Sequence, residues 1–202
     1  MTEFLYPFLE REEHDLATVL ADVSASTVQK GSDAIALRRG IDLAAVAACG
    51  RAIRERLERG GRLIAFGNGG SSTDAQDVAG DFLASGWPAL ALTNDVATIT
   101  AVANDIGEEN VFARQLIPLA RADDVALAIS TSGSSRNVVA GLHEAHRRLL
   151  LTCAITGYDG GKLRELDWID HLFVAESDYV PRLQEAHATV YHLLLEVVGA
   201  RA

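Results

Sequence analysis

The stretch LIAFGNGGSSTDAQDVAGDF covers residues 63–82 and runs from an apolar segment through a glycine-rich turn into a polar, alanine-containing segment. The apolar segment has the length of a buried strand, and the segment after the turn has the length of a helix. In that helix Asp74, Asp77 and Asp81 share one face, because they recur at intervals of three and four residues. Like charges at this spacing repel by about 0.2–0.5 kcal/mol per pair, so the face is either a solvated acidic surface or a functional site.

The alternation that begins at residue 62 continues to the end of the chain, with short apolar runs between stretches of helical length. Continuous apolar strands alternating with helices predict a parallel sheet covered by helices on both faces. The predicted strands cover residues 62–66, 88–92, 124–130, 149–155 and 170–175. We therefore predict the α/β class, as a three-layer αβα sandwich with a five-stranded parallel sheet.

Residues 1–60 precede this alternation and have the apolar spacing of helices, with a separate helical stretch over residues 41–58. They carry no evident chemistry, so we assign them to packing and oligomer contacts. No repeat, linker or low-complexity tract divides the chain. We therefore predict one domain over residues 1–202, composed of an N-terminal helical extension (1–60) and an α/β core (61–202).

The composition limits the classes of partner. The chain of 202 residues has a formal net charge of -10, which argues against non-specific binding to nucleic acid or to an anionic membrane. Its two cysteines, Cys49 and Cys153, have no metal-binding spacing and are read as reduced core thiols. The acidic N-terminus is unlike a signal peptide, and no apolar run is long enough to span a bilayer, so we predict a cytoplasmic protein.

Two glycine- and serine-rich loops follow predicted strands, GNGGSS at residues 67–72 and STSGSS at residues 130–135. In an open parallel sheet, ligands bind beyond the carboxyl ends of the strands, where both loops lie. Glycine lets the backbone approach a ligand, and the following helix N-terminus favours an anion, so the pair predicts a phosphate cradle. The alternative is that each loop serine only caps its helix. The hydroxyls available to a phosphate belong to Ser71, Ser130, Ser132 and Ser135.

Four blocks of sequence together resemble a known family. They are GNGGSxxDAQ, STSGxSxNV, TGYDGGKL at residues 156–163 and RLQEAHATVYH at residues 182–192. In this order they resemble the SIS (sugar isomerase) phosphosugar-binding family, and within it the phosphoheptose isomerases, from about residue 41 to residue 199. The resemblance implies a flavodoxin-like sheet, a homotetramer with active sites between subunits, and conversion of sedoheptulose 7-phosphate to an aldose heptose 7-phosphate through an enediol.

The resemblance also implies roles for individual residues. A glutamate and a histidine move the proton in this family, and their positions here are Asp81 and His192. Aspartate retains the carboxylate but is one methylene shorter. The positions implied to bind the phosphosugar are Asn68, Gly69, Gly70, Ser71, Asp105, Ser130, Thr131, Ser132, Ser135 and Gln184.

Some members of the family hold zinc, and the corresponding ligand positions here are Asp77, Asp81, Gln184 and His192. Asp77 stands where the family has a histidine. The resulting set is rich in oxygen, so manganese or magnesium competes better with zinc than at a histidine-rich site. The sequence leaves open which ion binds, and whether one binds.

A second interpretation is a non-catalytic, DiaA-like module that binds phosphosugars or other proteins. DiaA-like chains share most of the four blocks but typically lack the carboxylate at the position of Asp81. Because Asp81 and His192 are both present, the sequence favours the isomerase.

Overall fold

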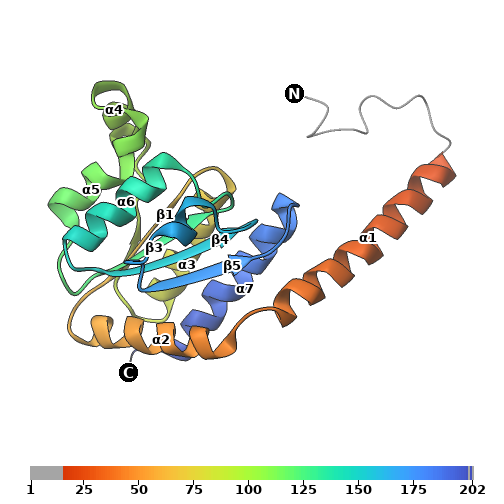
Figure 1. The fold of residues 1–202 in the computed structure, drawn as a ribbon, viewed down its shortest axis with the longest axis horizontal. Coiled ribbons are helices and arrows are strands. Elements are labelled where there is room, and N and C mark those ends of the chain that lie inside the picture. Colours follow the sequence, from red (N-terminus) through yellow and green to blue (C-terminus); the bar gives the residue numbers. More distant parts are fainter. Residues whose placement is uncertain (1–15, 200, 202) are drawn as a thin grey trace.

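The computed structural model describes residues 16–199 and residue 201, and Figure 1 shows an open sheet between helices, with one long helix extending to the side. The strands are β1 (Leu63–Gly67), β2 (Ala89–Ala91), β3 (Val125–Ser130), β4 (Leu151–Gly157) and β5 (His171–Ala175). The α-helices are α1 (Leu16–Arg39), α2 (Leu43–Glu58), α3 (Gly70–Ala84), α4 (Val96–Asp105), α5 (Val111–Leu119), α6 (Arg136–Arg147) and α7 (Val180–Val198). The short 3-10 helices are η2 (Glu108–Asn110) and η3 (Gly161–Glu165).

All five strands are parallel, in the order β2-β1-β3-β4-β5, which confirms the predicted sheet. Every residue of β1, β3 and β4 is buried, as expected for strands covered on both faces. Successive side chains point to opposite faces: Leu63 and Ala65 pack with α2, α3 and α7, whereas Ile64 and Phe66 pack with α5 and α6. These two cores make the three layers of the predicted sandwich.

The strand order reverses between β1 and β3, because the chain leaves β1 toward β2 and later returns to β3 on the other side. In open α/β sheets the crevice at the carboxyl ends of two such strands is the usual ligand site. The loops at residues 67–72 and 130–135 follow these two strands. The topology therefore brings the two serine loops to one crevice.

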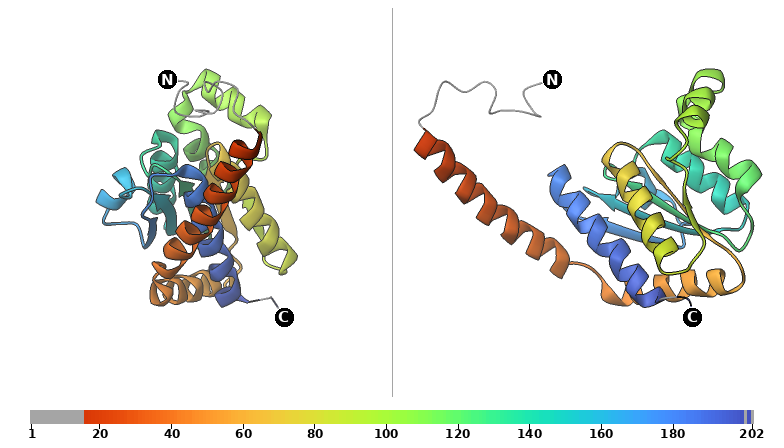
Figure 2. Two further views of the ribbon diagram at one scale, coloured as in Figure 1. Left: turned by 90° about the vertical axis from the view of Figure 1, so that its right-hand side faces the viewer. Right: turned by 180° about the vertical axis from the view of Figure 1, so that it is seen from behind.

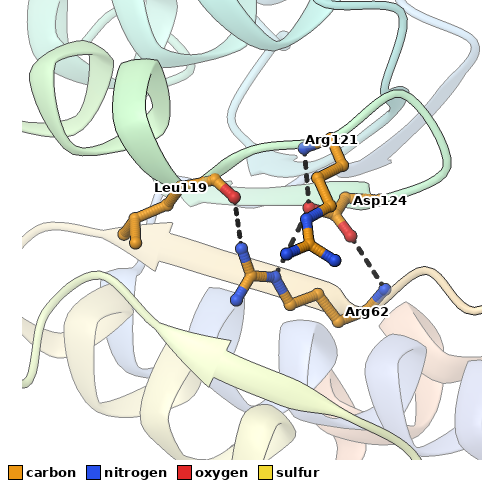
Figure 3. Close-up of polar contacts among 4 residues, drawn as sticks. All are labelled: Arg62, Leu119, Arg121 and Asp124. Atoms are coloured by element: carbon orange, nitrogen blue, oxygen red, sulfur yellow. Dashed lines mark hydrogen bonds and ion pairs between the residues drawn. The ribbon is translucent and has the colours of Figure 1, made fainter.

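The opposite, amino edge of the sheet is closed by a buried carboxylate, as Figure 3 shows. Asp124 is 1% exposed and accepts hydrogen bonds from the backbone N–H groups of Arg62 (3.0 Å) and Arg121 (2.9 Å) and from Nε of Arg62 (3.4 Å). The Arg62 guanidinium also donates to the carbonyl of Leu119. These bonds fix the starts of β1 and β3 to each other.

The helix α1 projects away from the rest of the chain in Figure 1 and in the right-hand view of Figure 2. None of its residues is buried, and its end nearest the sheet contacts α7, where Arg38 Nε donates to Thr189 Oγ1 at 3.2 Å. The predicted helical extension is thus present from residue 16 onward, and residues 1–15 lie outside the described part. The division of the chain at residue 60 stays a prediction. Among the described residues, no helix is long and apolar enough to cross a membrane.

Candidate active site

The two serine loops are tied to each other by a pair of amide side chains. Asn68 Nδ2 donates to Asn137 Oδ1 at 2.7 Å, and Asn137 Nδ2 donates to Asn68 Oδ1 at 3.0 Å. Asn68 lies in the loop after β1, and Asn137 lies in the first turn of α6. The reciprocal bonds therefore fix the spacing of the two loops across the crevice.

Both loops end at helix N-termini, and at α3 the N–H groups of Ser71 and Ser72 donate to the carbonyls of Asn68 and Gly69 at 3.0 Å each. Gly69 precedes α3 with a φ of 56°, a conformation that glycine adopts without strain, and a Cβ built there would meet no atom within 4 Å. Ser135 precedes α6, but among the described residues no side chain caps α3 or α6. Ser130 Oγ instead donates to Ser135 Oγ at 3.3 Å. The structure thus does not support the capping alternative, and both loops present the positive end of a helix dipole, which favours a phosphate.

The second loop rests on the segment TGYDGG. The N–H of Gly157 donates to the carbonyl of Thr131 at 2.9 Å, and the N–H of Leu163 donates to the carbonyl of Gly133 at 3.0 Å. A Cβ on Gly161 would lie 2.2 Å from the carbonyl oxygen of Ser132, so only glycine allows this close approach. This packing gives the second serine loop a rigid support.

A cavity of about 260 Å³ opens beside the two asparagines. Its lining residues are Asn68, Glu108, Glu109, Ser135, Arg136 and Asn137. Asp105 ends α4 three residues before Glu108, and its carboxylate accepts a hydrogen bond from Asn104 at 2.7 Å. Of the residues predicted to bind substrate, Asn68 and Ser135 therefore share this cavity, and a contact of Asp105 with substrate stays a prediction.

A second group of side chains lies between α3 and α7. Asp77, Asp81 and His192 each offer a ligand atom, and the three atoms lie within 4.8 Å of one another. His192 Nε2 is 3.2 Å from Asp81 Oδ2 and 3.8 Å from Asp77 Oδ2. All three side chains are solvent-accessible, with exposed fractions of 56% for Asp77, 39% for Asp81 and 50% for His192. The acidic face therefore opens to solvent and holds the two residues predicted to transfer protons.

Two further groups set the electrostatics of this face. Tyr191 Oη donates to Asp77 Oδ2 at 2.7 Å, and burial together with this bond raises the pKa of the phenol above its usual value. Burial and the neighbouring charge of Asp77 raise the pKa of Asp74 to about 6. The buried Oδ2 of Asp74 has no hydrogen-bond partner among the described residues. The environment of Asp74 therefore favours the protonated form of its carboxyl group.

The site residue Gln184 lies at the other end of the α3–α7 pair. A Cβ on Gly70 would fall 1.9 Å from Gln184 Nε2, so the amide packs directly against the first serine loop. His192 follows Gln184 by eight residues, or about 12 Å of helix axis. This position fits substrate binding, and Gln184 as a metal ligand stays a prediction.

Asp77, Asp81 and His192 fit a divalent cation in number and chemistry, because carboxylates and imidazole are ligands for divalent metal ions.

Two residues that contribute to the site were not predicted from the sequence. Asn137 lies in the STSGxSxNV block, and its place in that block was the only indication in the sequence that it belongs to the site. For Tyr191 the only indication was its position next to His192.

Comparison with known proteins places this geometry in a family. The family model described as SIS domain matches residues 41–157. A curated phosphoheptose isomerase of Thermodesulfovibrio yellowstonii is 41% identical over 152 residues, which are 72% of this chain and 75% of that protein. One of Thiobacillus denitrificans is 38% identical over 194 residues, covering 93% of this chain and 95% of that protein. The solved structure of a phosphoheptose isomerase from Francisella tularensis matches with a TM-score of 0.82 and 34% identity, covering 89% of this chain and 97% of that one.

Proposed function

We propose a function from one premise: this chain belongs to the SIS-domain family and, within it, to the phosphoheptose isomerases. Its reaction is the conversion of sedoheptulose 7-phosphate to an aldose heptose 7-phosphate. The observation that carries this proposal is the approach of Asp81 Oδ2 and His192 Nε2 to 3.2 Å, because ketose–aldose isomerisation needs a group that takes a proton and a group that delivers one. The relatives named above favour this over the DiaA-like binding module.

In the proposed reaction one proton leaves C1 of the ketose and one arrives at C2. The C1–H bond breaks, its electron pair forms the C1=C2 bond of an enediol, and the C2 carbonyl oxygen gains a proton. A proton then returns to C2 while the C1 hydroxyl loses its own, which leaves the aldehyde. Asp81 and His192 are the proposed acid/base pair, since a carboxylate and an imidazole in contact can exchange roles within one turnover.

The serine loops are proposed to hold the phosphate end of the substrate. The hydrogen-bond donors are the hydroxyls of Ser71, Ser130, Ser132 and Ser135 and the N-terminal N–H groups of α6. The helices α3 and α6 add the positive ends of two dipoles. Binding through these groups requires no net positive charge, which agrees with the net charge of -10.

Asp77, Asp81 and His192 are the residues that would hold a divalent ion. When bound, such an ion supplies a Lewis acid that polarises a carbonyl oxygen. The single nitrogen ligand and the two carboxylates support manganese or magnesium as well as zinc. A bound cation would also offset the negative charges of Asp77 and Asp81. It would thereby reduce the repulsion that is expected between two carboxylates four residues apart on a helix.

A second copy of the chain is proposed to complete the site, in a homotetramer. Support comes from α1, which buries no residue of its own and exposes apolar side chains that a partner would cover. They include Leu16, Leu20, Val23, Val28 and Ile35. The half-exposed His192 also leaves room for a neighbouring chain. A cytoplasmic location stays a prediction.

The test is turnover of sedoheptulose 7-phosphate by purified protein, followed by proton NMR of the sugar. Three samples are compared: chelated protein, protein with added zinc and protein with added manganese. We expect an aldose heptose 7-phosphate to form, and dependence on an added ion would support the metal site. A folded, oligomeric protein that yields no product under all three conditions would contradict the isomerase and favour the binding module.

A further inference from the structure

Tyr191 connects the hydrophobic core to the acid/base face. It is 2% exposed and belongs to the core formed by α2, α3, α7 and one face of the sheet, which also includes Val78 and Phe82 of α3. The next residue, His192, is half exposed, because consecutive residues on a helix point about 100° apart. Tyr191 is therefore held by packing, while the residue beside it faces solvent.

The hydroxyl of this buried ring ends on Asp77. Tyr191 Oη lies 2.7 Å from Asp77 Oδ2, which is the same oxygen that lies 3.8 Å from His192 Nε2. A hydrogen bond to a carboxylate is stronger than one between neutral groups. The phenol O–H is the donor of this bond and the carboxylate oxygen is its acceptor.

The ring of Tyr191 also contacts His192. The two ring centroids are 4.7 Å apart with an interplanar angle of 66°, an edge-to-face arrangement. One rigid residue thus touches two of the three members of the acid/base face. Asp77 itself is 56% exposed, and its other charged neighbours, Asp74 and Asp81, repel it. Among the described residues, Tyr191 is the one hydrogen-bond donor to the Asp77 carboxylate.

We propose that Tyr191 is a positioning residue, whose hydroxyl holds the Asp77 carboxylate toward His192 and so sets the geometry of the face that the proposed isomerase uses. The expected effect of Tyr191 on turnover rests on the proposed function. The dependence of the Asp77 orientation on the Tyr191 hydroxyl rests only on the contacts described above.

The test is Tyr191→Phe, which keeps the ring in the core and removes only the hydroxyl. Crystal structures of the wild type and of this variant compare the Asp77 side chain directly. We expect the carboxylate to leave its position near His192 in Tyr191→Phe. An Asp77 carboxylate that stays in the same position in both structures would overturn the proposal, whether or not the protein is an isomerase.

Kinetics supply the second readout. Loss of a group that orients a ligand or catalytic residue typically costs about 10- to 100-fold in activity or metal affinity, so kcat of Tyr191→Phe should fall by about that factor with KM within about twofold. Adding Tyr191→Phe to Asp77→Asn should cost nothing further, because the hydroxyl acts through Asp77. Independent, multiplied losses in the double variant would contradict the proposal. Tyr179→Phe, the same change just before α7, is the control and should leave kcat unchanged.

Wild-type protein without turnover would refute the proposed function. The crystal structures would then still decide the role of Tyr191, so the two failures are distinguishable.

Discussion

Two aspartates of this protein face a basic side chain at nearly the same distance but differ in their exposure to solvent. Asp124 Oδ2 lies 3.4 Å from Arg62 Nε at the amino edge of the sheet, and Asp81 Oδ2 lies 3.2 Å from His192 Nε2 between α3 and α7. The Asp124 side chain is 2% exposed and the Asp81 side chain is 39% exposed. Distance alone therefore does not separate a structural ion pair from a reactive one.

The difference lies in what else surrounds each carboxylate. Asp124 accepts two backbone N–H bonds as well as the guanidinium, so its desolvation is compensated and its conformation is fixed. Asp81 keeps access to solvent, and its partner is the half-exposed imidazole of His192. We infer that the amino edge contributes stability and that the α3–α7 face contributes chemistry, and substitutions at the two sites test this division.

The largest expected effect comes from the basic partner at the exposed pair. His192→Asn removes the imidazole that exchanges protons with Asp81, so kcat should fall by about 10²- to 10⁴-fold. The midpoint of thermal unfolding should change little, because the His192 side chain is half exposed. Steady-state turnover and a melting curve of the same preparation test both statements. A marked fall in the unfolding midpoint would contradict the division, because it would show that the α3–α7 face also contributes stability.

The second effect is the converse one, at the buried pair. Asp124→Asn keeps the shape of the side chain but removes its charge. It also replaces one acceptor oxygen by an NH2 group, which then faces at least one of the three N–H donors. The free energy of unfolding should fall by about 2–3 kcal/mol. Turnover per folded molecule should match the wild type. Urea denaturation measures the first quantity, and a loss of turnover in fully folded Asp124→Asn would show that the amino edge also affects the chemistry.

A third expectation concerns pH. The pKa of Asp74 is about 6 in the folded chain and 3.8 in a model peptide, so the folded state favours its protonated form. The stability that this gives is fully present below about pH 4 and is lost as the pH rises through about 6. Asp74→Asn removes the charge, so at pH 7.5 the variant should be more stable than the wild type by about 2 kcal/mol, less than the full shift implies because the group is partly solvated.

The check is urea denaturation of both proteins between pH 4 and pH 7.5. The advantage of Asp74→Asn should be small at the acid end and should grow across the pH range in which Asp74 ionises. An advantage that is constant with pH would contradict the raised pKa.

The smallest effect is expected at the second serine loop. Ser130→Ala removes a hydroxyl that is 4% exposed and donates to Ser135. Loss of one phosphate contact should raise KM for sedoheptulose 7-phosphate by about tenfold, which corresponds to about 1.4 kcal/mol. Initial rates over a range of substrate concentrations give KM and kcat separately. A change in kcat alone would place this serine with the proton-transfer groups rather than with the phosphate.

The sequence was sufficient for the features that depend on local spacing. Alternating apolar and helical segments predicted every strand, with ends shifted by one or two residues, as in β1 (Leu63–Gly67) against the predicted 62–66. The interval of four residues placed Asp77 and Asp81 on one helix face, as the structure confirms. The meeting of that face with His192 followed only from the family resemblance.

Contacts across the chain could not be predicted from spacing. The bond between Asn68 and Asn137 joins positions 69 residues apart, and the bond between Tyr191 and Asp77 joins positions 114 residues apart. Each depends on how two elements pack, α6 beside the first loop and α7 beside α3, and such packing is set by the tertiary fold. In the sequence, Tyr191 cannot be distinguished from the other core residues that recur at helical spacing in residues 180–198.

The most direct test of the division is Asp81→Asn, assayed for sedoheptulose 7-phosphate turnover and for unfolding free energy in one preparation. Asparagine has the same size but neither accepts nor donates the transferred proton. We predict a loss of about 10³-fold or more in kcat with a change in unfolding free energy within about 0.5 kcal/mol. Turnover within twofold of the wild type would contradict the assignment of the chemistry to the α3–α7 face.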